Sequence, residues 1–571
     1  MFTSEIKKSL FKALRALSLD ISEEKIILEH PADVSYGDYS TNIALKLKNS
    51  KETAETVVKK WQEIGLPEFV EKVEVAGAGF INIWLNFEAL SRQLMEVLNA
   101  GNSFGQGKMG EGKTVVVDYS APNIAKPFGI GHLRSTNIGQ AIYNTYKAVG
   151  FKTIGDNHLG DWGTQFGKLI YKILEIKDKK KLSELSIEDL EKLYVEFHKE
   201  AEEKPEMEEE ARKLFKKLEE GDKEVKEIWQ ICADVSLEEF NRIYDLLGVK
   251  IDFALGESFF QDKMGAVLQD CRKKGILKES QGAQVVEILG MEIPAMLVKS
   301  DGATTYLLRD LATIKYRVAE WQADLIIYEV GVDQTFHFKQ LFNIATQLGY
   351  GKPEMFVHVG HGLIRWPTGK FSTRKGDTVH LEDVLTEAIE RAAAFVPPGE
   401  TSASQRINIA RAVGIGAIKY NDLKQNPRTD IVFDWDQVLS LQGNSGPYLQ
   451  YSFARTQSVL RKAKDLNLKF LIFNFKSISN VKILNVSNEE ISLLRTIYRF
   501  PEAIADAARE FSPNLVCNFL FDLAQKFNLF YDKERIIGNE NEEFRLLLTS
   551  AVGQVLKNGL TLLGIEALEK M

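Results

Sequence analysis

"TVVVDYSAPNIAKPFGIGHLRST", residues 114–136, joins an apolar run to a helical pattern through a loop that contains two prolines and two glycines. The run 114–120 predicts a buried strand, and a helix is expected over 132–149, where Gly150 fits its C-terminal end. A second strand, "FKTIGDN" (151–157), follows. Strand, helix and strand within about forty residues predict a right-handed crossover unit of a parallel sheet.

The loop between this strand and this helix is the first candidate ligand site. In open parallel sheets, ligands bind beyond the carboxyl ends of the strands. Gly129 and Gly131 allow the backbone to approach a nucleotide, and the helix that starts near His132 offers free N–H groups to a phosphate. The alternative is a tight connection without a ligand, in which Ser135 or Thr136 caps the helix.

A second phosphate motif fails on its context. Residues 107–114, "GKMGEGKT", match the GxxxxGK[ST] phosphate loop in letters. A functional loop of this kind follows a strand and opens a helix, whereas here a loop precedes and the strand 114–120 follows. We therefore interpret this match as a coincidence.

The bulk composition predicts a soluble, cytoplasmic protein of several domains. Its 571 residues are 44% hydrophobic, and domains of roughly 100–200 residues give about three or four of them. No window reaches the roughly 18–20 apolar residues of a membrane helix, and the N-terminal pattern lacks a cleavage site. The net charge of −8 offers no global attraction to nucleic acid, so such binding would depend on local basic faces. Three distant cysteines without a CxxC pair predict buried thiols.

Patterns along the chain predict a small α+β domain over 1–105 and a helical region over 406–571 with a loop-like break at 467–487. Between them, the charged stretch 168–247 carries helical stripes and is interpreted as an insertion. Strand-like runs then return and are expected to complete the interrupted sheet; they are "AQVVEIL" (283–289), "IPAMLV" (293–298), "ADLIIYEVG" (323–331) and "MFVHVGHGLI" (355–364).

The loop that ends in His132 resembles the HIGH motif of class I aminoacyl-tRNA synthetases, in the version found in the arginyl-tRNA synthetase family. Other stretches are similar to that family in the same order: "YGDYSTN" (36–42), "DNHLGDWGTQFG" (156–167), "TTYLLRDLATIKYR" (304–317), "VGVDQTFHFKQLF" (330–342), "KFSTRKG" (370–376), "GNSGPYLQYSFAR" (443–455) and the final "LEKM". The resemblance covers nearly the whole chain. It implies a Rossmann-like α/β catalytic domain over 106–405, an N-terminal tRNA-contacting domain and an all-α anticodon-binding domain.

The resemblance implies ATP-dependent ligation of arginine to its tRNA through an arginyl-adenylate, with Mg²⁺ accompanying ATP. "KFSTRKG" resembles the KMSK loop, in which Lys370, Arg374 and Lys375 are candidate phosphate contacts. Thr373 stands at the place of the second KMSK lysine, and we expect Lys126 to supply that charge. The further ATP-binding candidates are Pro122, Gly129, Ile130, Gly131, His132, Gly360, Gly362 and Ser372.

An arginine side chain presents a planar fork of donors, so its pocket is expected to contain carboxylates and an aromatic ring or hydroxyl. By resemblance these are Glu257, Tyr306 and Asp310, and the spacing of the last two places them on one helical face. Asn123 and Gln334 are expected to bind the α-amino and carboxylate groups. For any of these carboxylates, the alternative role is a surface salt bridge.

Candidate tRNA contacts lie at both ends of the chain. Aromatic rings interleaved with positive charge suit single-stranded RNA, although a stripe of this kind is also typical of a helical core. The candidates are Tyr36, Asn42, Tyr448, Tyr451 and Arg455. A monomer without a membrane partner is expected.

His358 and His361 form an HxxH pair, but the alternating run around them predicts a strand end and no acidic third ligand stands nearby. No tightly bound protein metal is therefore expected.

Two departures from the family pattern affect the predicted ATP site. Gly129 stands where the first HIGH histidine would be, and Ala121 stands where the family often has serine.

Two other functions compete with the arginine ligase. A nucleotidyltransferase for another small acid is disfavoured by the Glu257, Tyr306 and Asp310 set, and a noncatalytic RNA-binding relative is disfavoured by His132 and the lysine-rich loop.

Overall fold

The computed structural model describes residues 2–176, 182, 184–366, 379–396, 402–465, 481 and 483–571. The chain forms two compact units. One comprises Gly105–Arg455, Pro501–Ala524 and Leu556–Met571, and the other comprises Met1–Phe104, Thr456–Phe500 and Gln525–Val555.

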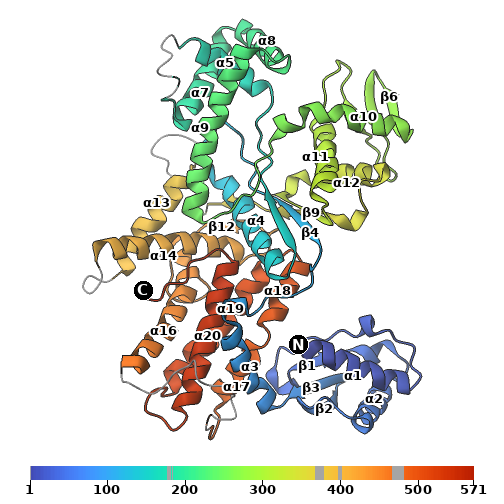
Figure 1. Ribbon diagram of the computed structural model, residues 1–571, viewed down its shortest axis with the longest axis vertical. Helices are drawn as coiled ribbons and strands as arrows, with labels where there is room; N and C mark the ends of the chain where they lie inside the picture. The colour runs from blue at the N-terminus through green and yellow to red at the C-terminus, as the bar shows by residue number, and fades with distance from the viewer. Residues whose placement is uncertain are drawn as a thin grey trace. The chain divides into compact units, whose positions relative to one another are not determined.

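A four-stranded parallel sheet with the order β10-β9-β4-β5 forms the centre of the larger unit. Figure 1 labels its strands β4 and β9. Its elements are β4 (Thr114–Asp118), α4 (Ile130–Ala148), β5 (Lys152–Asp156), β9 (Leu325–Gly331) and β10 (Phe356–His361). The predicted strand–helix–strand unit is confirmed, with α4 beginning at Ile130 instead of His132. Apolar Ile138, Ala141 and Ile142 of α4 are buried, and polar Asn137 and Gln140 are buried as well.

The charged stretch after β5 is helical, as predicted. It forms α5 (Thr164–Leu174), α7 (Ile187–Glu203), α8 (Glu206–Glu219) and the long α9 (Lys223–Leu247), which lie together at the top of Figure 1. Ile228 and Cys232 of α9 pack with Phe166 and Ile170 of α5 in one buried cluster. Ser236 and Tyr244, farther along α9, contact the loop that follows β4.

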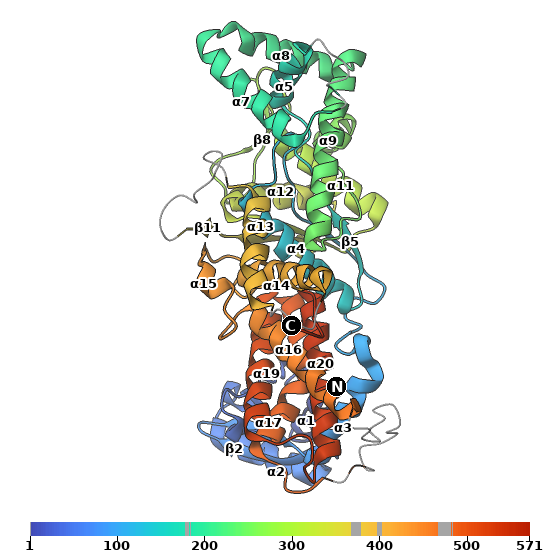
Figure 2. The same ribbon diagram turned by 90° about the vertical axis from the view of Figure 1, so that its left-hand side faces the viewer.

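Helices dominate the C-terminal part of the chain. They are α13 (Leu381–Ala392), α14 (Ala403–Leu423), α15 (Trp435–Val438), α16 (Gly446–Asp465), α17 (Asn488–Ile497), α18 (Phe500–Arg509), α19 (Asn514–Lys533) and α20 (Glu542–Leu562). In the larger unit, α14 lies beside α13 and α4 (Figure 2). A short parallel pair, β11 (Ile364–Arg365) with β12 (Ile431–Val432), interrupts the helices. Most of the predicted break at 467–487 lies outside the described residues.

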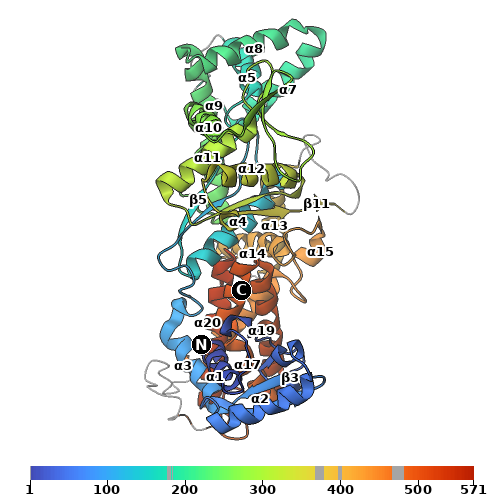
Figure 3. The ribbon, with the colours of Figure 1, turned by 90° about the vertical axis from the view of Figure 1, so that its right-hand side faces the viewer.

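The smaller unit contains the predicted N-terminal α+β fold (Figure 3). Its antiparallel sheet has the order β1-β3-β2, and helices α1 (Phe2–Ala16), α2 (Ser50–Ile64) and α3 (Phe87–Ala100) accompany it. The strands are β1 (Tyr39–Thr41), β2 (Val70–Ala76) and β3 (Phe80–Leu85).

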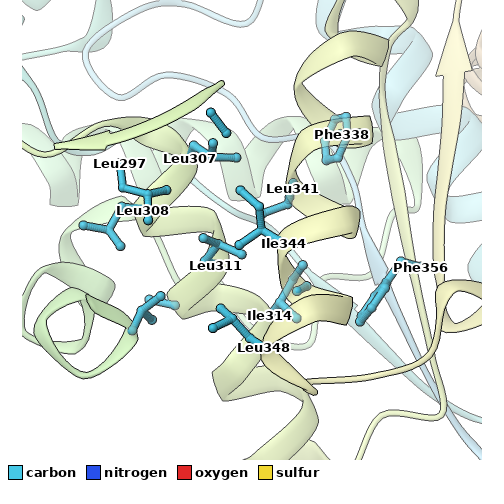
Figure 4. Close-up of a cluster of buried hydrophobic side chains, with 14 of the residues drawn as sticks. Leu297, Leu307, Leu308, Leu311, Ile314, Phe338, Leu341, Ile344, Leu348 and Phe356 are labelled. Atoms are coloured by element: carbon cyan, nitrogen blue, oxygen red, sulfur yellow. The ribbon is translucent and has the colours of Figure 1, made fainter. Parts of the chain in front are cut away.

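The prediction that four apolar runs complete the parallel sheet is wrong for two of them. β6 (Leu277–Ser280), β7 (Ala283–Val286) and β8 (Ala295–Val298) form a separate antiparallel sheet. This sheet packs against α10 (Met264–Lys273), α11 (Tyr306–Trp321) and α12 (Thr335–Leu348) in a core that includes Leu297, Leu311 and Leu341 (Figure 4). Short apolar runs satisfy either sheet locally, and only the packing of distant segments decides between them.

All three cysteines are buried free thiols, as predicted: Cys232, Cys271 and Cys517. Within the described ranges, no helix is long and apolar enough to cross a membrane.

Candidate active site

The loop after β4 has a strained backbone. Ser120, Ala121 and Ala125 have φ values of 75°, 44° and 62°, in the left-handed region that side chains other than glycine rarely occupy. Such a conformation costs about 1–3 kcal/mol per residue and persists only where surrounding contacts impose it. Backbone strain of this kind is concentrated at functional sites, which favours a ligand site over an ordinary turn.

Hydrogen bonds from several elements hold this loop. The Ser120 N–H donates to Ser135 Oγ at 2.9 Å, and the Ala121 N–H donates to Asn157 Oδ1 at 3.0 Å. The Ala125 N–H donates to Ser236 Oγ of the helical insertion at 2.8 Å. The insertion therefore shapes the loop directly.

The alternative in which Ser135 or Thr136 caps the helix is wrong. Gly129 is the N-cap of α4. The Ser135 hydroxyl donates to the Glu329 carbonyl of β9 at 2.7 Å, and the Thr136 hydroxyl donates to the His132 carbonyl at 2.7 Å. Ser135 thus joins the start of α4 to the neighbouring strand.

His132 lies in the first turn of α4. Its Nδ1 accepts the Gly129 N–H at 3.2 Å, so a neutral ring carries its proton on Nε2. Burial lowers the pKa of His132, and the positive charge of Lys126 acts in the same direction. At neutral pH the uncharged ring can therefore donate a hydrogen bond from its Nε2–H without first taking up a second proton.

The segment 156–161 connects the loop to the predicted arginine-binding residues. Gly160 pairs with Asn123, and a Cβ at position 160 would overlap the side-chain amide oxygen of Asn123. The Glu257 N–H donates to the Leu159 carbonyl at 3.0 Å, and His158 Nε2 lies 3.8 Å from Asp310 Oδ1. Three of the predicted residues are therefore gathered around one segment.

Both predicted carboxylates already have partners within the chain. Arg309 Nη1 donates to Glu257 Oε2 at 2.8 Å, and His337 Nε2 donates to Asp310 Oδ2 at 2.7 Å. Burial raises the pKa of Glu257 to about 7 despite the nearby guanidinium. Burial is the largest influence on Asp310 and would raise its pKa, but the hydrogen bond and charge of His337, with the charges of His158 and Arg309, together outweigh burial and lower the pKa of that carboxyl. Sequence reasoning missed Arg309, His337 and His158; only their places inside the quoted motifs pointed to them.

The remaining predicted arginine-binding side chains are more open. Tyr306 is 61% exposed at the start of α11, and Arg309 lies over its ring at 5.3 Å. Gln334 is exposed at the end of the short helix η6 (Val332–Gln334), where β9 leads into α12. Asn123 is also exposed.

A buried charged triad joins the strands that carry these segments. Arg317 Nη2 of α11 donates to Asp118 Oδ2 at 2.6 Å and to Asp156 Oδ2 at 2.7 Å. The Arg317 and Asp156 side chains are completely buried. Because Asp118 ends β4 and Asp156 ends β5, this triad holds the two carboxyl ends together.

Gly360 and Gly362, the glycines on β10 and just after it that are predicted to bind ATP, lie close to other parts of the chain. A Cβ at Gly362 would lie 2.7 Å from Asp430 Oδ1, and a Cβ at Gly360 would lie 3.2 Å from the Val332 Cα. Packing within the chain therefore requires glycine at position 362 even without a nucleotide. Pro122 is buried, and Ile130 donates its N–H to the Val379 carbonyl at 3.1 Å.

His361 has an acidic neighbour that the sequence analysis did not identify. Glu329 Oε1, on the adjacent strand β9, lies 3.0 Å from His361 Nδ1. The expectation that no acidic group stands nearby is therefore wrong in three dimensions, because parallel pairing aligns residues distant in sequence. Among the described residues, no group of three or more metal-ligating side chains could hold a metal ion.

Of the lysine and arginine residues predicted to contact phosphate, Lys126 lies within the described part of the chain. Lys370, Ser372, Thr373, Arg374 and Lys375 lie outside the described residues. The Lys126 ammonium lies over the Tyr194 ring of the insertion at 5.4 Å.

Among the predicted tRNA contacts, Tyr36 is 54% exposed and Asn42 is half-buried. Tyr451 is 40% exposed with Arg455 over its ring at 5.1 Å, whereas Tyr448 packs on Phe521.

The sequence of this chain matches three family descriptions. Residues 93–435 match "tRNA synthetases class I (R), catalytic domain", residues 449–571 match "DALR anticodon binding domain", and residues 4–85 match "Arginyl tRNA synthetase N terminal domain". These ranges account for both ends of the chain as well as the sheet that carries the candidate site.

Known proteins resemble the chain over nearly its whole length. It is 40% identical over 560 residues to the arginine–tRNA ligase of Clostridium botulinum (strain Loch Maree / Type A3), with 97% of each chain covered. It is 39% identical to the arginine–tRNA ligase of Clostridium kluyveri, with 99% and 98% covered. The crystal structure of arginyl-tRNA synthetase from Plasmodium falciparum superposes with a TM-score of 0.84 at 26% identity and covers all of this chain and 99% of that one. With these relatives and with a parallel sheet, a small N-terminal domain and an all-helical C-terminal domain, this chain belongs to the arginyl-tRNA synthetase family of class I aminoacyl-tRNA synthetases.

Proposed function

We propose that the chain ligates L-arginine to its tRNA in two steps at the loop after β4. In the first step, the arginine carboxylate attacks the α-phosphate of ATP, which forms arginyl-adenylate and releases pyrophosphate. In the second step, the arginyl group moves to the tRNA 3′ end and AMP leaves. The observation that carries the proposal is the strained loop 120–125 and its neighbours. Segment 156–161 contacts this loop on one side and the carboxylate residues Glu257 and Asp310 on the other.

Positioning and electrostatics supply most of the catalysis in such a reaction. In our proposal, His132 donates its Nε2–H to an ATP phosphate, and the backbone of residues 129–131 approaches the nucleotide. ATP enters as its Mg²⁺ complex, so the metal is part of the substrate. Lys370, Ser372, Arg374 and Lys375 contact the triphosphate from the KMSK-like loop, and Pro122, Ile130, Gly360 and Gly362 complete the nucleotide site.

Glu257 and Asp310 receive the arginine side chain in this proposal, together with Tyr306. A guanidinium that binds Glu257 favours its ionised form, and the pKa of Glu257 near 7 makes that preference relevant at neutral pH. Asn123 and Gln334 bind the α-amino and carboxylate groups. Substrates without a fork of donors leave unpaired the acceptor sites of these carboxylates that Arg309 and His337 do not use, which discriminates against such substrates.

We further propose that Tyr36 and Asn42 contact the tRNA from the N-terminal domain, and that Tyr448, Tyr451 and Arg455 contact the anticodon region. The proposed domains are 1–105, 106–405 and 406–571. The proposed form is a cytoplasmic monomer.

Pyrophosphate exchange tests the proposal against its competitors. The protein is incubated with ATP, labelled pyrophosphate and each amino acid in turn, with and without tRNA. Exchange that requires arginine and tRNA is expected. Exchange with another acid would indicate a different nucleotidyltransferase, and the absence of exchange under every condition would indicate a noncatalytic relative.

Lys126→Ala is expected to slow adenylate formation about tenfold or more, because Lys126 supplies the charge that Thr373 lacks. Tyr194, on which Lys126 lies in this structure, provides the control. Tyr194→Leu removes the ring and keeps the ammonium, so exchange is expected to remain close to wild type. Wild-type exchange by Lys126→Ala would remove Lys126 from the phosphate site.

Gly129→His tests whether the missing first HIGH histidine is a deficit. Gly129 has a φ of −82°, and the nearest atom to a Cβ there is His132 Nδ1 at 3.7 Å, so the backbone accepts a side chain without strain. If catalysis is limited by the absence of an imidazole at position 129, the Gly129→His variant is expected to form the adenylate several-fold faster, as measured by pyrophosphate exchange. An unchanged rate would show that other groups already supply that contact.

A further inference from the structure

His361 and Glu329 form an ion pair where two central strands end. His361 is the last residue of β10 and lies opposite Gly331 of β9, and Glu329 is two positions earlier on β9. His361 Nδ1 lies 3.0 Å from Glu329 Oε1; the glutamate side chain is completely buried, and the histidine side chain is 12% exposed. The carboxyl ends of parallel strands border the crevice in which this fold binds ligands.

The second ring nitrogen of His361 lies on the side of Gly331 and Asp333. Nδ1 faces Glu329, which leaves Nε2 as the second donor of the cation. A Cβ at Gly331 would lie 2.5 Å from Asp333 Oδ1 and 3.9 Å from His361 Nε2, so the missing side chain at position 331 gives the Asp333 carboxylate room on the same side of the ring. Among the described residues, Nε2 has no hydrogen-bond partner, and neither has the buried Glu329 Oε2.

Charged groups of both signs surround the ring. From α4 come His132 and Arg134, from α14 Asp422, from β9 Glu329, from η6 Asp333 and from β10 itself His358. Burial disfavours a charged ring, but Glu329 outweighs burial and raises the pKa of His361 above its ordinary value. His361 also lowers the pKa of His132. Ser135, one turn after His132 on α4, donates to the Glu329 carbonyl at 2.7 Å, so the ion pair lies against the start of that helix.

A purely structural role does not account for this pair. A buried ion pair contributes little net stability, because desolvation of both groups offsets their attraction. Here one carboxylate oxygen is left without a partner in the described part of the chain, which increases that penalty. The arrangement instead keeps a cation beside His132, at the strand ends next to Gly360 and Gly362.

We propose that His361, paired with the buried Glu329, is a further ATP-binding residue that supplies positive charge beside His132, where Gly129 provides no side chain. The proposal rests on the ATP site of the proposed function. It differs from the role of Lys126, because the histidine is fixed on the sheet and its charge depends on pH.

The test measures binding of the nonhydrolysable analogue α,β-methylene-ATP with Mg²⁺ by calorimetry, on the full chain with tRNA present. His361→Gln is expected to raise the Kd about tenfold, because a charge-assisted hydrogen bond is lost. Glu329→Gln keeps the imidazole but removes the carboxylate that favours its charge. His358→Gln is the matched control, since His358 lies on the same strand and contacts the Val330 carbonyl at 3.1 Å. Its Kd is expected to equal that of wild type.

The pH profile separates a binding role from a structural one. In wild type, binding is expected to weaken as pH rises through the raised pKa of His361, because the cation is present below it and lost above it. In His361→Gln, this weakening of binding with rising pH should be absent. In Glu329→Gln, it should occur at lower pH. The titration of the ligand itself is common to all variants and cancels in the comparison.

The inference would be overturned if wild type and His361→Gln had the same Kd for the analogue and the same change of Kd with pH. That failure is distinguishable from failure of the proposed function, which is judged on wild type alone by arginine-dependent pyrophosphate exchange. Melting temperatures of the three variants identify unfolding. If His361→Gln is unstable, Glu329→Gln still decides the matter, since binding that weakens at the same pH as in wild type contradicts the proposal.

Discussion

Replacing Arg317 with methionine is expected to lower the free energy of unfolding by about 3–5 kcal/mol, because it leaves two buried carboxylates without their cation. Arg317 is fully buried and donates to Asp118 and Asp156 at 2.6 and 2.7 Å. Methionine has a similar length, so loss of volume contributes little. Denaturant unfolding of the variant and of wild type measures the difference.

An exposed ion pair provides the control for Arg317. Arg212 lies 3.2 Å from Glu209, and both side chains are more than half exposed. Because solvent screens such pairs, Arg212→Met is expected to change the free energy of unfolding by less than about 1 kcal/mol. Equal effects of the two substitutions would show that the triad does not stabilise the strand ends. Arg317→Met is also expected to impair activation, since β4 and β5 carry the loop and segment 156–161.

His132→Ala is expected to lower the kcat of arginine-dependent pyrophosphate exchange by about 100-fold or more, which is the typical effect of removing one preorganised donor. The ring donates as a neutral group, because burial lowers its pKa and its Nδ1 accepts the Gly129 N–H. The KM for arginine should change little, since three predicted arginine-binding residues contact segment 156–161 and none of the five lies on α4.

His198 serves as the control for His132. It lies exposed on α7 of the insertion, so His198→Ala is expected to retain wild-type kcat. A His132→Ala variant that folds like wild type and keeps its kcat would exclude His132 from the phosphate site. A change confined to the KM for arginine would instead move His132 to the amino-acid side.

The sequence predicted the elements whose causes are local. Strand β4 and helix α4 follow from a valine-rich run, a proline and glycine loop and a helical period, and the insertion follows from apolar stripes at helical spacing. The same local logic predicts a ligand site in the loop 120–136 and rejects one at residues 107–114. In the structure the positive φ values of Ser120, Ala121 and Ala125 favour the same interpretation.

Pairings between distant residues required the tertiary structure. Glu257 and Arg309 are 52 positions apart, and Glu329 and His361 are 32 apart, so neither pair leaves a periodic trace in the sequence. The same holds for runs 283–289 and 293–298, whose apolar residues suit either sheet until α10, α11 and α12 pack against them. The sequence by itself determined the family, the order of elements and the residue types of the site, because those depend on short segments. Only the tertiary structure decided which charges meet, because burial and strand register bring together groups that the chain keeps far apart.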